Sequence, residues 1–182
     1  MPSTWAIRCA AWCGPSGSLS PVSVPPAYRK LEIAAPQDAG ETLAQVARWL
    51  HGEWGAFHGA DLEDTRVWLQ GVLDNRPEEA LMVACADGEP VGVALLVACD
   101  LPERSELTPW LSSLYVLPEW RGKTIGRRLV GAITMLARHH GHARLYLYTS
   151  TPRLYEKLGW RDLETLAIVG RQFRLMEKAL VD

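Results

Sequence analysis

Hydrophobic positions recur with two different periods along the chain, and these periods predict helices and strands from about residue 30 onward. A short apolar run at 31–33 predicts a first strand. Asp38 is expected to cap a helix whose apolar positions 43, 46, 47 and 50 follow the i, i+3, i+4, i+7 spacing of one helical face. Gly52 and Gly55 are expected to loosen the end of this helix.

The middle of the chain predicts a second helix, a hairpin and a strand–helix pair. The helix follows Asp61 and ends near residues 75–77. Two apolar runs, 80–86 and 91–97, flank an Asp-Gly turn and predict a hairpin of buried strands. After a loop at 100–108, a strand is expected at 110–117. A long helix follows, with apolar positions 125, 129, 133 and 136, and Gly141 ends it.

The last forty residues predict a strand, a short helix and a final pair of strands. The strand covers 143–148 and the short helix 151–158. Two more strands fit near 160–168 and 172–178, with a turn at Gly170. The order is therefore one strand, two helices, three strands, a helix, a strand, a helix and two strands. This order is typical of a mixed α/β layer.

The first 28 residues differ from the rest of the chain. Gly and Pro interrupt any periodicity there, so an irregular N-terminal extension is predicted for 1–28 and a single domain for 29–182. The segment is a loose extension, the product of a start codon assigned too early, or a segment that docks on the domain through Trp5 and Trp12.

Composition excludes several classes of function. The formal net charge is −2, so the charge balance favours neither nucleic acid nor a membrane surface. No apolar run reaches the roughly 18–20 residues that a membrane-spanning helix needs. Cysteines are sparse and lack metal-ligand spacing, so no metal site is expected, and a cytoplasmic location is expected. Cys85 and Cys99 fall in apolar runs and are expected to be buried.

The most informative stretch runs from residue 114 to 129, where a strand leads through a turn into a helix. The first turn of a helix has N–H groups without intrahelical partners, and the helix dipole adds positive charge there. Gly122 and Gly126 remove side chains that would keep a ligand away from the backbone. Four basic residues lie in the same turn: Arg121, Lys123, Arg127 and Arg128. These features together predict a site for a di-anion such as pyrophosphate.

Other phosphate-binding loops fit less well. A Walker A loop would need Gly at position 117, where the chain has Leu. The Gly-x-Gly-x-x-Gly fingerprint of dinucleotide-binding folds is absent from this stretch. The remaining alternative is a basic, solvated first turn, but cations are unfavourable at a helix N-terminus.

The stretch Val116-x-Pro118-x-x-Arg121-Gly122-x-x-Ile125-Gly126-x-x-Leu129 resembles motif A of the GNAT N-acetyltransferases. Downstream, Leu154-Tyr155-Glu156-Lys157-Leu158-Gly159-Trp160 resembles the second signature of that family. The resemblance covers about residues 29–179. It implies an α/β GNAT fold with a mixed sheet of six to seven strands and about four helices. Two parallel strands would splay apart to hold acetyl-CoA, and a bulge near residues 110–113 would fit that splay.

The resemblance also implies a coenzyme site. The backbone of Leu114 and Val116 would bind the pantetheine arm and the acetyl carbonyl. The N–H groups of the loop would hold the pyrophosphate. Thr124 stands where the family often has Gly; it is expected in helical conformation, with a hydroxyl that can donate to phosphate. Thr149 or Ser150 would replace an Asn of relatives. The expected coenzyme residues are Leu114, Val116, Arg121, Gly122, Lys123, Thr124, Ile125, Gly126, Arg127 and Thr149.

Direct acetyl transfer from the coenzyme to an amine makes three chemical demands. The Val116 N–H would polarise the thioester carbonyl. Tyr155 would protonate the leaving thiolate; its alternative role is a packed aromatic. The base that deprotonates the ammonium is Glu53, Asp100, His58 or a water relay, because residues 110–113 include no acid. Each of the three candidates has the alternative of being a solvated surface residue.

The predicted function is acetyl-CoA-dependent transfer of an acetyl group to a primary amine of an unidentified small molecule or peptide. The acceptor pocket would form from the first two helices, loop 100–108 and the last two strands. The acidic residues Asp100, Glu103 and Glu106 would suit a cationic acceptor. Alternatives are a non-catalytic acyl-CoA sensor and a toxin-type or aminoacyl-transfer relative. Acetyl-CoA and the amine are the expected partners, with neither nucleic acid nor membrane, and a homodimer is left open.

Overall fold

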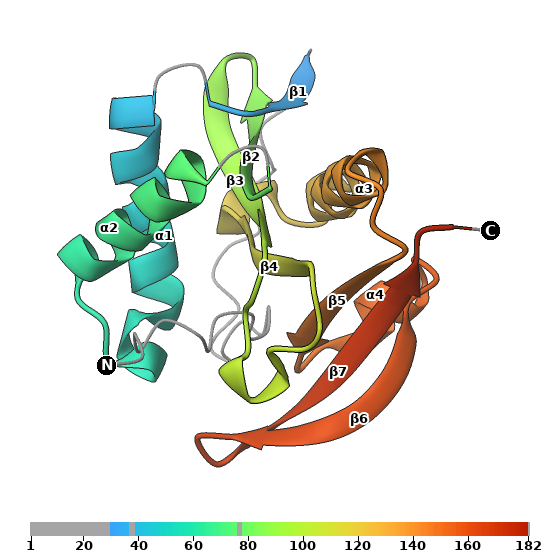
Figure 1. Ribbon diagram of the computed structural model, residues 1–182. Coiled ribbons are helices and arrows are strands. Elements are labelled where there is room, and N and C mark those ends of the chain that lie inside the picture. Colours follow the sequence, from blue (N-terminus) through green and yellow to red (C-terminus); the bar gives the residue numbers. More distant parts are fainter. Residues whose placement is uncertain (1–29, 37–38, 76–77, 182) are drawn as a thin grey trace.

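The computed structural model describes residues 30–36, 39–75 and 78–181 (Figure 1). The predictions for residues 1–28, and for Asp38 as a helix cap, lie outside these described ranges. Within them the predicted order of elements is confirmed.

One sheet of seven strands runs through the molecule in the order β1-β2-β3-β4-β5-β7-β6. The strands are β1 (Leu31–Ala34), β2 (Ala80–Ala86), β3 (Glu89–Val97), β4 (Trp110–Val116), β5 (Arg144–Thr149), β6 (Arg161–Ile168) and β7 (Arg171–Ala179). β4 and β5 pair in parallel, and the other neighbours pair antiparallel. The mixed sheet of six to seven strands is thus confirmed.

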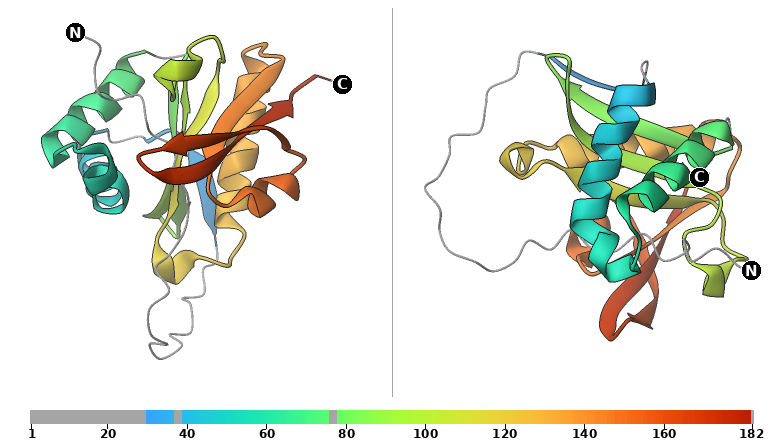
Figure 2. Two further views of the ribbon diagram at one scale, coloured as in Figure 1. Left: turned by 90° about the horizontal axis from the view of Figure 1, so that it is seen from below. Right: turned by 90° about the vertical axis from the view of Figure 1, so that its left-hand side faces the viewer.

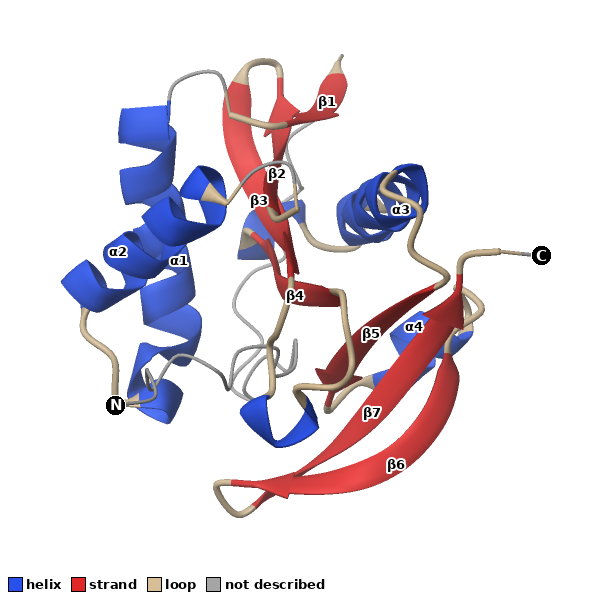
Figure 3. Ribbon diagram, viewed as in Figure 1, coloured by secondary structure: helices blue, strands red, loops and turns tan. Residues whose placement is uncertain are grey.

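Helices cover the sheet on both faces, as Figures 2 and 3 show. The α-helices are α1 (Ala39–His58), α2 (Leu62–Asp74), α3 (Ile125–His139) and α4 (Pro152–Glu156). Two 3₁₀ turns, η1 (Pro102–Arg104) and η2 (Pro118–Trp120), lie before and after β4. α1 and α2 lie on one side of the sheet, and α3 and α4 lie on the other.

The two faces of the sheet bury two separate apolar clusters. The first cluster includes Leu43, Val46 and Leu50 of α1. The second includes Ile125, Leu129 and Ile133 of α3, which confirms the predicted apolar faces of both helices. Each fully buried aliphatic side chain stabilises the fold by roughly 1.5–3 kcal/mol. The pocket described below lies on the α3 side of β4.

Two local expectations were wrong. α1 does not loosen at its glycines but continues to His58. Gly55 packs closely against the His51 ring, since a Cβ at position 55 would lie only 2.4 Å from its Nδ1. Cys99 is exposed rather than buried, since it follows the end of β3, and Cys85 is half-buried.

The start of α2 matches its prediction. Asp61 accepts a hydrogen bond from the Asp64 N–H, and Asp64 accepts one from the Asp61 N–H, which forms a capping box.

Within the described ranges, no helix combines the length and apolarity needed to cross a membrane. The same ranges contain no cluster of His, Cys, Asp and Glu suited to a metal ion.

Candidate active site

β4 and β5 separate almost as soon as they meet. Their register contains the single described pair Trp110–Tyr146, supported by a hydrogen bond from the Tyr146 N–H to the Pro109 carbonyl at 3.0 Å. By contrast, β5 pairs with β7 along its whole length. The backbone groups of β4 that face β5 beyond Trp110 are therefore not used by a strand ladder. Such groups bind polar ligands strongly.

A bulge in β4 accompanies this separation. Val93 opposes Tyr115 and Leu95 opposes Ser112, so one extra residue is inserted in β4. Ser113 has a φ of 51° and marks the insertion, which confirms the expected bulge. The bulge re-aims the strand just before Leu114.

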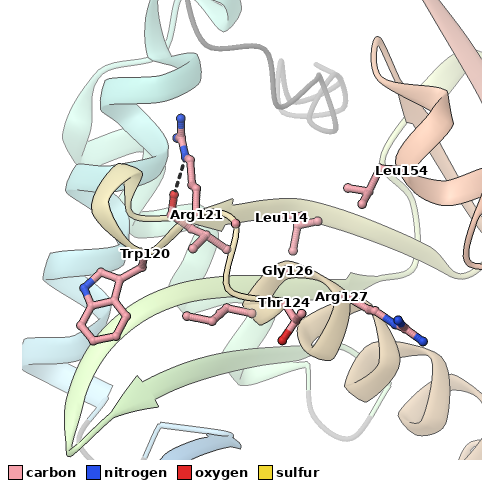
Figure 4. Close-up of a pocket in the computed structure, with 10 residues that line it drawn as sticks. Leu114, Trp120, Arg121, Thr124, Gly126, Arg127 and Leu154 are labelled. Atoms are coloured by element: carbon pink, nitrogen blue, oxygen red, sulfur yellow. Dashed lines mark hydrogen bonds between the residues drawn. The ribbon is translucent and has the colours of Figure 1, made fainter. Parts of the chain in front are cut away.

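A pocket of about 280 Å³ lies between the end of β4 and the start of α3 (Figure 4). It is lined by Leu114, Val116, Trp120, Arg121, Gly122, Thr124, Ile125, Gly126, Arg127 and Leu154. Two of the predicted coenzyme residues, Lys123 and Thr149, are absent from this lining. Trp120 and Leu154 were not predicted, because their places depend on a 3₁₀ turn and on the packing of α4.

The start of α3 is built to receive an anion. Thr124 is the N-cap, and its side chain makes no capping hydrogen bond, so the first N–H groups of the helix are left for a ligand. A Cβ on Gly126 would lie 3.8 Å from Val116 Cγ2, so Gly126 keeps the gap between α3 and β4 open.

Thr124 corrects one expectation. Its φ is 65°, which is left-handed rather than helical. A β-branched residue is unfavourable in this region. The backbone of this loop therefore suits the Gly that the family often has there.

Arg121 turns away from the start of α3. Its Nε donates to the Val116 carbonyl at 2.9 Å, as the dashed line in Figure 4 shows. Its Nη2 lies 3.8 Å from Glu53 Oε2 on α1, and its guanidinium lies 5.7 Å from the centre of the Tyr115 ring. Its backbone N–H donates to the Pro118 carbonyl. The backbone N–H of Arg121 is therefore already used within the η2 turn.

Lys123 also lies differently from the expectation. Its ammonium lies 4.3 Å from the centre of the Trp120 ring, a cation–π contact at the edge of the pocket. This contact fixes the indole of Trp120 as part of the pocket wall.

Tyr155 lies in α4 and is 4% exposed. Its ring makes a T-shaped contact with Trp160, with centroids 5.8 Å apart. It belongs to the same buried cluster as Leu114 and Val116, and its neighbour Leu154 lines the pocket. This position is compatible with both the acid role and the packed-aromatic role, so the acid role stays a prediction.

Thr149 and Ser150 follow one another at the end of β5, but their hydroxyl groups differ in hydrogen bonding. The Thr149 hydroxyl accepts from the Thr151 N–H at 3.0 Å and contacts the Thr151 hydroxyl, so it closes the turn into α4. The Ser150 Oγ is buried and has no hydrogen-bond partner within the described part of the chain. Ser150 is therefore the better candidate to contact a ligand.

The candidate bases have three different settings. Glu53 lies toward Arg121. The His58 side chain lies outside the described residues. Asp100 is buried, 1% exposed, and accepts a hydrogen bond from Ser112 Oγ at 2.9 Å. The alternative that Asp100 is a solvated surface residue is therefore wrong, because the chain after β3 folds back onto the face of β4.

The described tryptophans of α1 and β4 pack in or against the core. Trp49 stacks on Tyr115 with centroids 5.8 Å apart, and Trp54 meets the same ring edge-on. Burial raises the pKa of Tyr115, and the nearby Arg121 charge partly opposes this effect. Trp110 contacts Tyr146 on the same side of the sheet. These rings form the α1-facing wall of β4 and β5.

The loop around η1 carries negative charge. Burial raises the pKa of the Cys99 thiol, and the carboxylates of Asp100, Glu103 and Glu106 raise it further. Arg104 pairs with Glu164 of β6 at 2.7 Å, which holds this loop beside the last two strands.

Comparisons with known proteins agree with this geometry. Residues 43–160 match the model of the Acetyltransferase (GNAT) family. A curated aminoglycoside N(6')-acetyltransferase type 1 of Stenotrophomonas maltophilia is 33% identical over 112 residues, which cover 59% of this chain and 71% of that protein.

Solved structures share the fold at low sequence identity. An aminoglycoside 6'-N-acetyltransferase complexed with coenzyme A is 18% identical, with a TM-score of 0.67 over 83% of this chain and 98% of that one. An N-acetyltransferase from Staphylococcus aureus Mu50 is 18% identical, with a TM-score of 0.66 over 84% of this chain and 100% of that one.

Proposed function

Because the chain belongs to the GNAT acetyltransferase family, we propose that it moves the acetyl group of acetyl-CoA directly to a primary amine of a polycationic amino sugar. The chain is an acyltransferase with acetyl-CoA as its acetyl donor. The amino-sugar acceptor is supported by the name of the curated relative, an aminoglycoside N(6')-acetyltransferase. The observation that carries the proposal is the pocket between the separated strand β4 and the uncapped start of α3.

The residues of this pocket fit the coenzyme. The N–H groups from Gly122 to Arg127 are the proposed pyrophosphate donors, since the helix start has no side-chain cap. Leu114 and Val116 offer backbone groups to the two amides of the pantetheine arm. Gly126 leaves the space for that arm between α3 and β4. Bound here, the coenzyme supplies a thioester carbonyl and a thiolate leaving group.

The direction of the Val116 N–H supports its role at the carbonyl. The next residue, Leu117, donates its N–H to the Val91 carbonyl on β3 at 3.0 Å. Successive N–H groups of a strand point to opposite edges. The Val116 N–H therefore points toward the gap beside β5, where it is suited to stabilise a developing oxyanion.

Tyr155 is the proposed proton donor to the leaving sulfur. A phenol stays protonated at neutral pH and can donate in the transition state. Burial beside Leu114 and Val116 keeps bulk water from competing for that proton.

Charge supports the polycationic acceptor. Glu103 and Glu106 are exposed on the loop around η1, and their charges act on Cys99 together with that of Asp100. The Arg104–Glu164 pair holds this loop beside β6. Several ammonium groups on one small molecule would be attracted to this surface.

The sensor hypothesis depended on the missing carboxylate of β4. Asp100 Oδ1 lies 2.9 Å from Ser112 Oγ, so a carboxylate is present beside that strand although it comes from another segment. This contact favours the enzyme over the sensor.

The test measures release of free thiol from acetyl-CoA by the full chain with kanamycin A, which carries a 6′-amine. A neutral disaccharide and a lysine peptide serve as comparison acceptors. Of the three acceptors, we expect only kanamycin A to be acetylated. We also expect acetyl-CoA, but neither ATP nor NAD, to raise the melting temperature of the protein. Turnover with the lysine peptide alone would refute the amino-sugar acceptor. No thermal shift at millimolar acetyl-CoA would refute the placement of the coenzyme.

A further inference from the structure

A hydrogen-bonded row of three polar side chains crosses the buried face of β4. The Ser112 hydroxyl donates to Asp100 Oδ1 at 2.9 Å, and it lies 3.2 Å from the Ser113 hydroxyl. All three side chains are buried, with 1%, 0% and 3% exposed for Asp100, Ser112 and Ser113. A buried carboxylate costs free energy unless hydrogen bonds compensate it, so this row calls for an explanation.

The row lies on the acceptor side of the strand. Ser112 opposes Leu95 in the register of β3 and β4, and cross-strand partners share a face of the sheet. Leu95 belongs to the cluster that packs under α1 and α2, whereas Leu114 and Val116 line the coenzyme pocket under α3. The carboxylate and the coenzyme are thus on opposite faces of β4.

The row ends where β4 separates from β5. Ser113 is the bulge residue, with a φ of 51°, and β4 has already left β5 at this point. Because β4 and β5 are not paired beyond Trp110, an acceptor amine on the α1 side can approach the thioester here without crossing a strand ladder. Ser113 follows Ser112 along β4, so its hydroxyl is the end of the row that is nearer to the gap between β4 and β5.

We infer that Ser113 and Ser112 form a proton relay that carries the proton of the acceptor ammonium to Asp100. The inference rests on the proposed function, because it needs an ammonium acceptor. It gives Asp100 the role of terminal proton acceptor and the two serines the role of carriers. The family resemblance would place an acid on β4 itself, but here the acid reaches β4 from the loop that follows β3.

The protons balance along this path. The ammonium N–H bond breaks, Ser113 receives that proton and passes its own to Ser112, and Ser112 passes its own to Asp100. The free amine then forms the C–N bond. The amine nitrogen loses its second proton to the Tyr155 phenolate left after protonation of the thiolate. Asp100 returns its proton to solvent through the same hydroxyls after the product leaves.

Burial raises the pKa of the neighbouring Cys99 thiol, and the charges of Asp100, Glu103 and Glu106 on the same loop add to this effect. Arg104 of this loop is paired with Glu164. On β4 the Ser112 hydroxyl donates to Asp100, and the Ser113 hydroxyl contacts that of Ser112.

The test compares pH profiles of kcat/KM with kanamycin A for the wild-type chain, Asp100→Asn and Ser112→Ala. The wild type should reach a plateau near neutral pH. Both variants should lose about 10²-fold in kcat at neutral pH. Their kcat/KM should keep rising about tenfold per pH unit toward the pKa of the free amine, since only amine that is already neutral can react. Asp100→Glu should restore part of the rate and the plateau.

Controls separate this relay from a structural role. Glu89→Gln, which changes an exposed carboxylate at the start of β3, should match the wild type. Acetyl-CoA should raise the melting temperature of every variant equally. If Asp100→Asn does not fold, Ser112→Ala carries the test, because it keeps the carboxylate. An unchanged profile shape, or a wild-type kcat, would overturn the relay and leave the proposed function standing. A wild-type chain inactive on kanamycin A would remove the acceptor proposal, and the relay with it.

Discussion

Arg121 Nε lies 2.9 Å from the carbonyl oxygen of Val116, so this arginine, which also lines the pocket, holds the loop after β4 against the strand. The same guanidinium lies 3.8 Å from Glu53 on α1. One side chain thereby connects the loop, β4 and α1. Arg127 also lines the pocket, and we expect it to contribute to coenzyme binding rather than to the position of the loop.

Exchanging each arginine for methionine separates these two roles. Arg121→Met should lower the free energy of unfolding by about 1–3 kcal/mol, because a hydrogen bond from a charged donor is lost. Its acetyl-CoA affinity should fall less than that of Arg127→Met, which should bind more weakly at unchanged stability. Thermal unfolding and titration calorimetry measure both quantities. The reverse pattern would show that Arg121 contacts phosphate.

Thr124→Gly should stabilise the protein. Thr124 has a φ of 65°, and a side chain with a Cβ is sterically unfavourable in this left-handed conformation. Replacing it with glycine should therefore raise the free energy of unfolding by about 1–2 kcal/mol. The greater freedom of glycine in the unfolded chain offsets up to about 1 kcal/mol of this gain. Thr134→Gly is the matched control, because Thr134 lies inside α3 and donates to the Val130 carbonyl. Chemical denaturation should show a gain for the first variant and a loss for the second.

Gly126→Ala should weaken coenzyme binding without unfolding the chain. The new methyl group would meet Val116 and Leu114 at 3.8 and 3.9 Å, which is ordinary contact, yet it would occupy the coenzyme gap. We expect about a tenfold loss in acetyl-CoA affinity, or 1.4 kcal/mol. Gly131→Ala, with open space around it in the same helix, should gain up to about 1 kcal/mol in stability at unchanged affinity. Equal affinities of the two variants would contradict the placement of the pantetheine arm.

Tyr155→Phe should lower kcat about 10²-fold and leave acetyl-CoA affinity unchanged. The phenyl ring can keep the T-shaped contact with Trp160, so the melting temperature should stay close to that of the wild type. Stopped assays of thiol release, together with calorimetry, distinguish the two effects. A fully active variant would leave Tyr155 with the packing role alone.

Local patterns explain what the sequence could predict. The apolar faces of α1 and α3 and the loop from Arg121 to Gly126 are contiguous signals, so the layer order and the pocket followed from them. The left-handed Thr124 and the turn of Arg121 toward Val116 depend on tertiary packing. The contact between Asp100 and Ser112 joins two segments across a loop, and no local period encodes it.

Glu177 on β7 gives the fold a predictable acid sensitivity. Its side chain is 7% exposed and accepts hydrogen bonds from Arg144 and Arg161. Burial raises the pKa of this carboxyl, but the two guanidinium hydrogen bonds lower it more, so the pKa lies below its usual value. A carboxyl with a lowered folded-state pKa stabilises the fold above its unfolded pKa of about 4.3. That contribution is lost as the pH falls through the folded-state pKa.

Glu177→Gln should therefore lower the free energy of unfolding by about 1–3 kcal/mol at pH 7, and the difference from the wild type should shrink below about pH 4. Melting temperatures between pH 7 and pH 3 measure this convergence. Glu164→Gln is the control, because Glu164 is partly exposed and its pair with Arg104 is screened by solvent, so its effect should be smaller. A constant difference between Glu177→Gln and the wild type over the whole range would mean that Glu177 contributes by packing rather than by its charge.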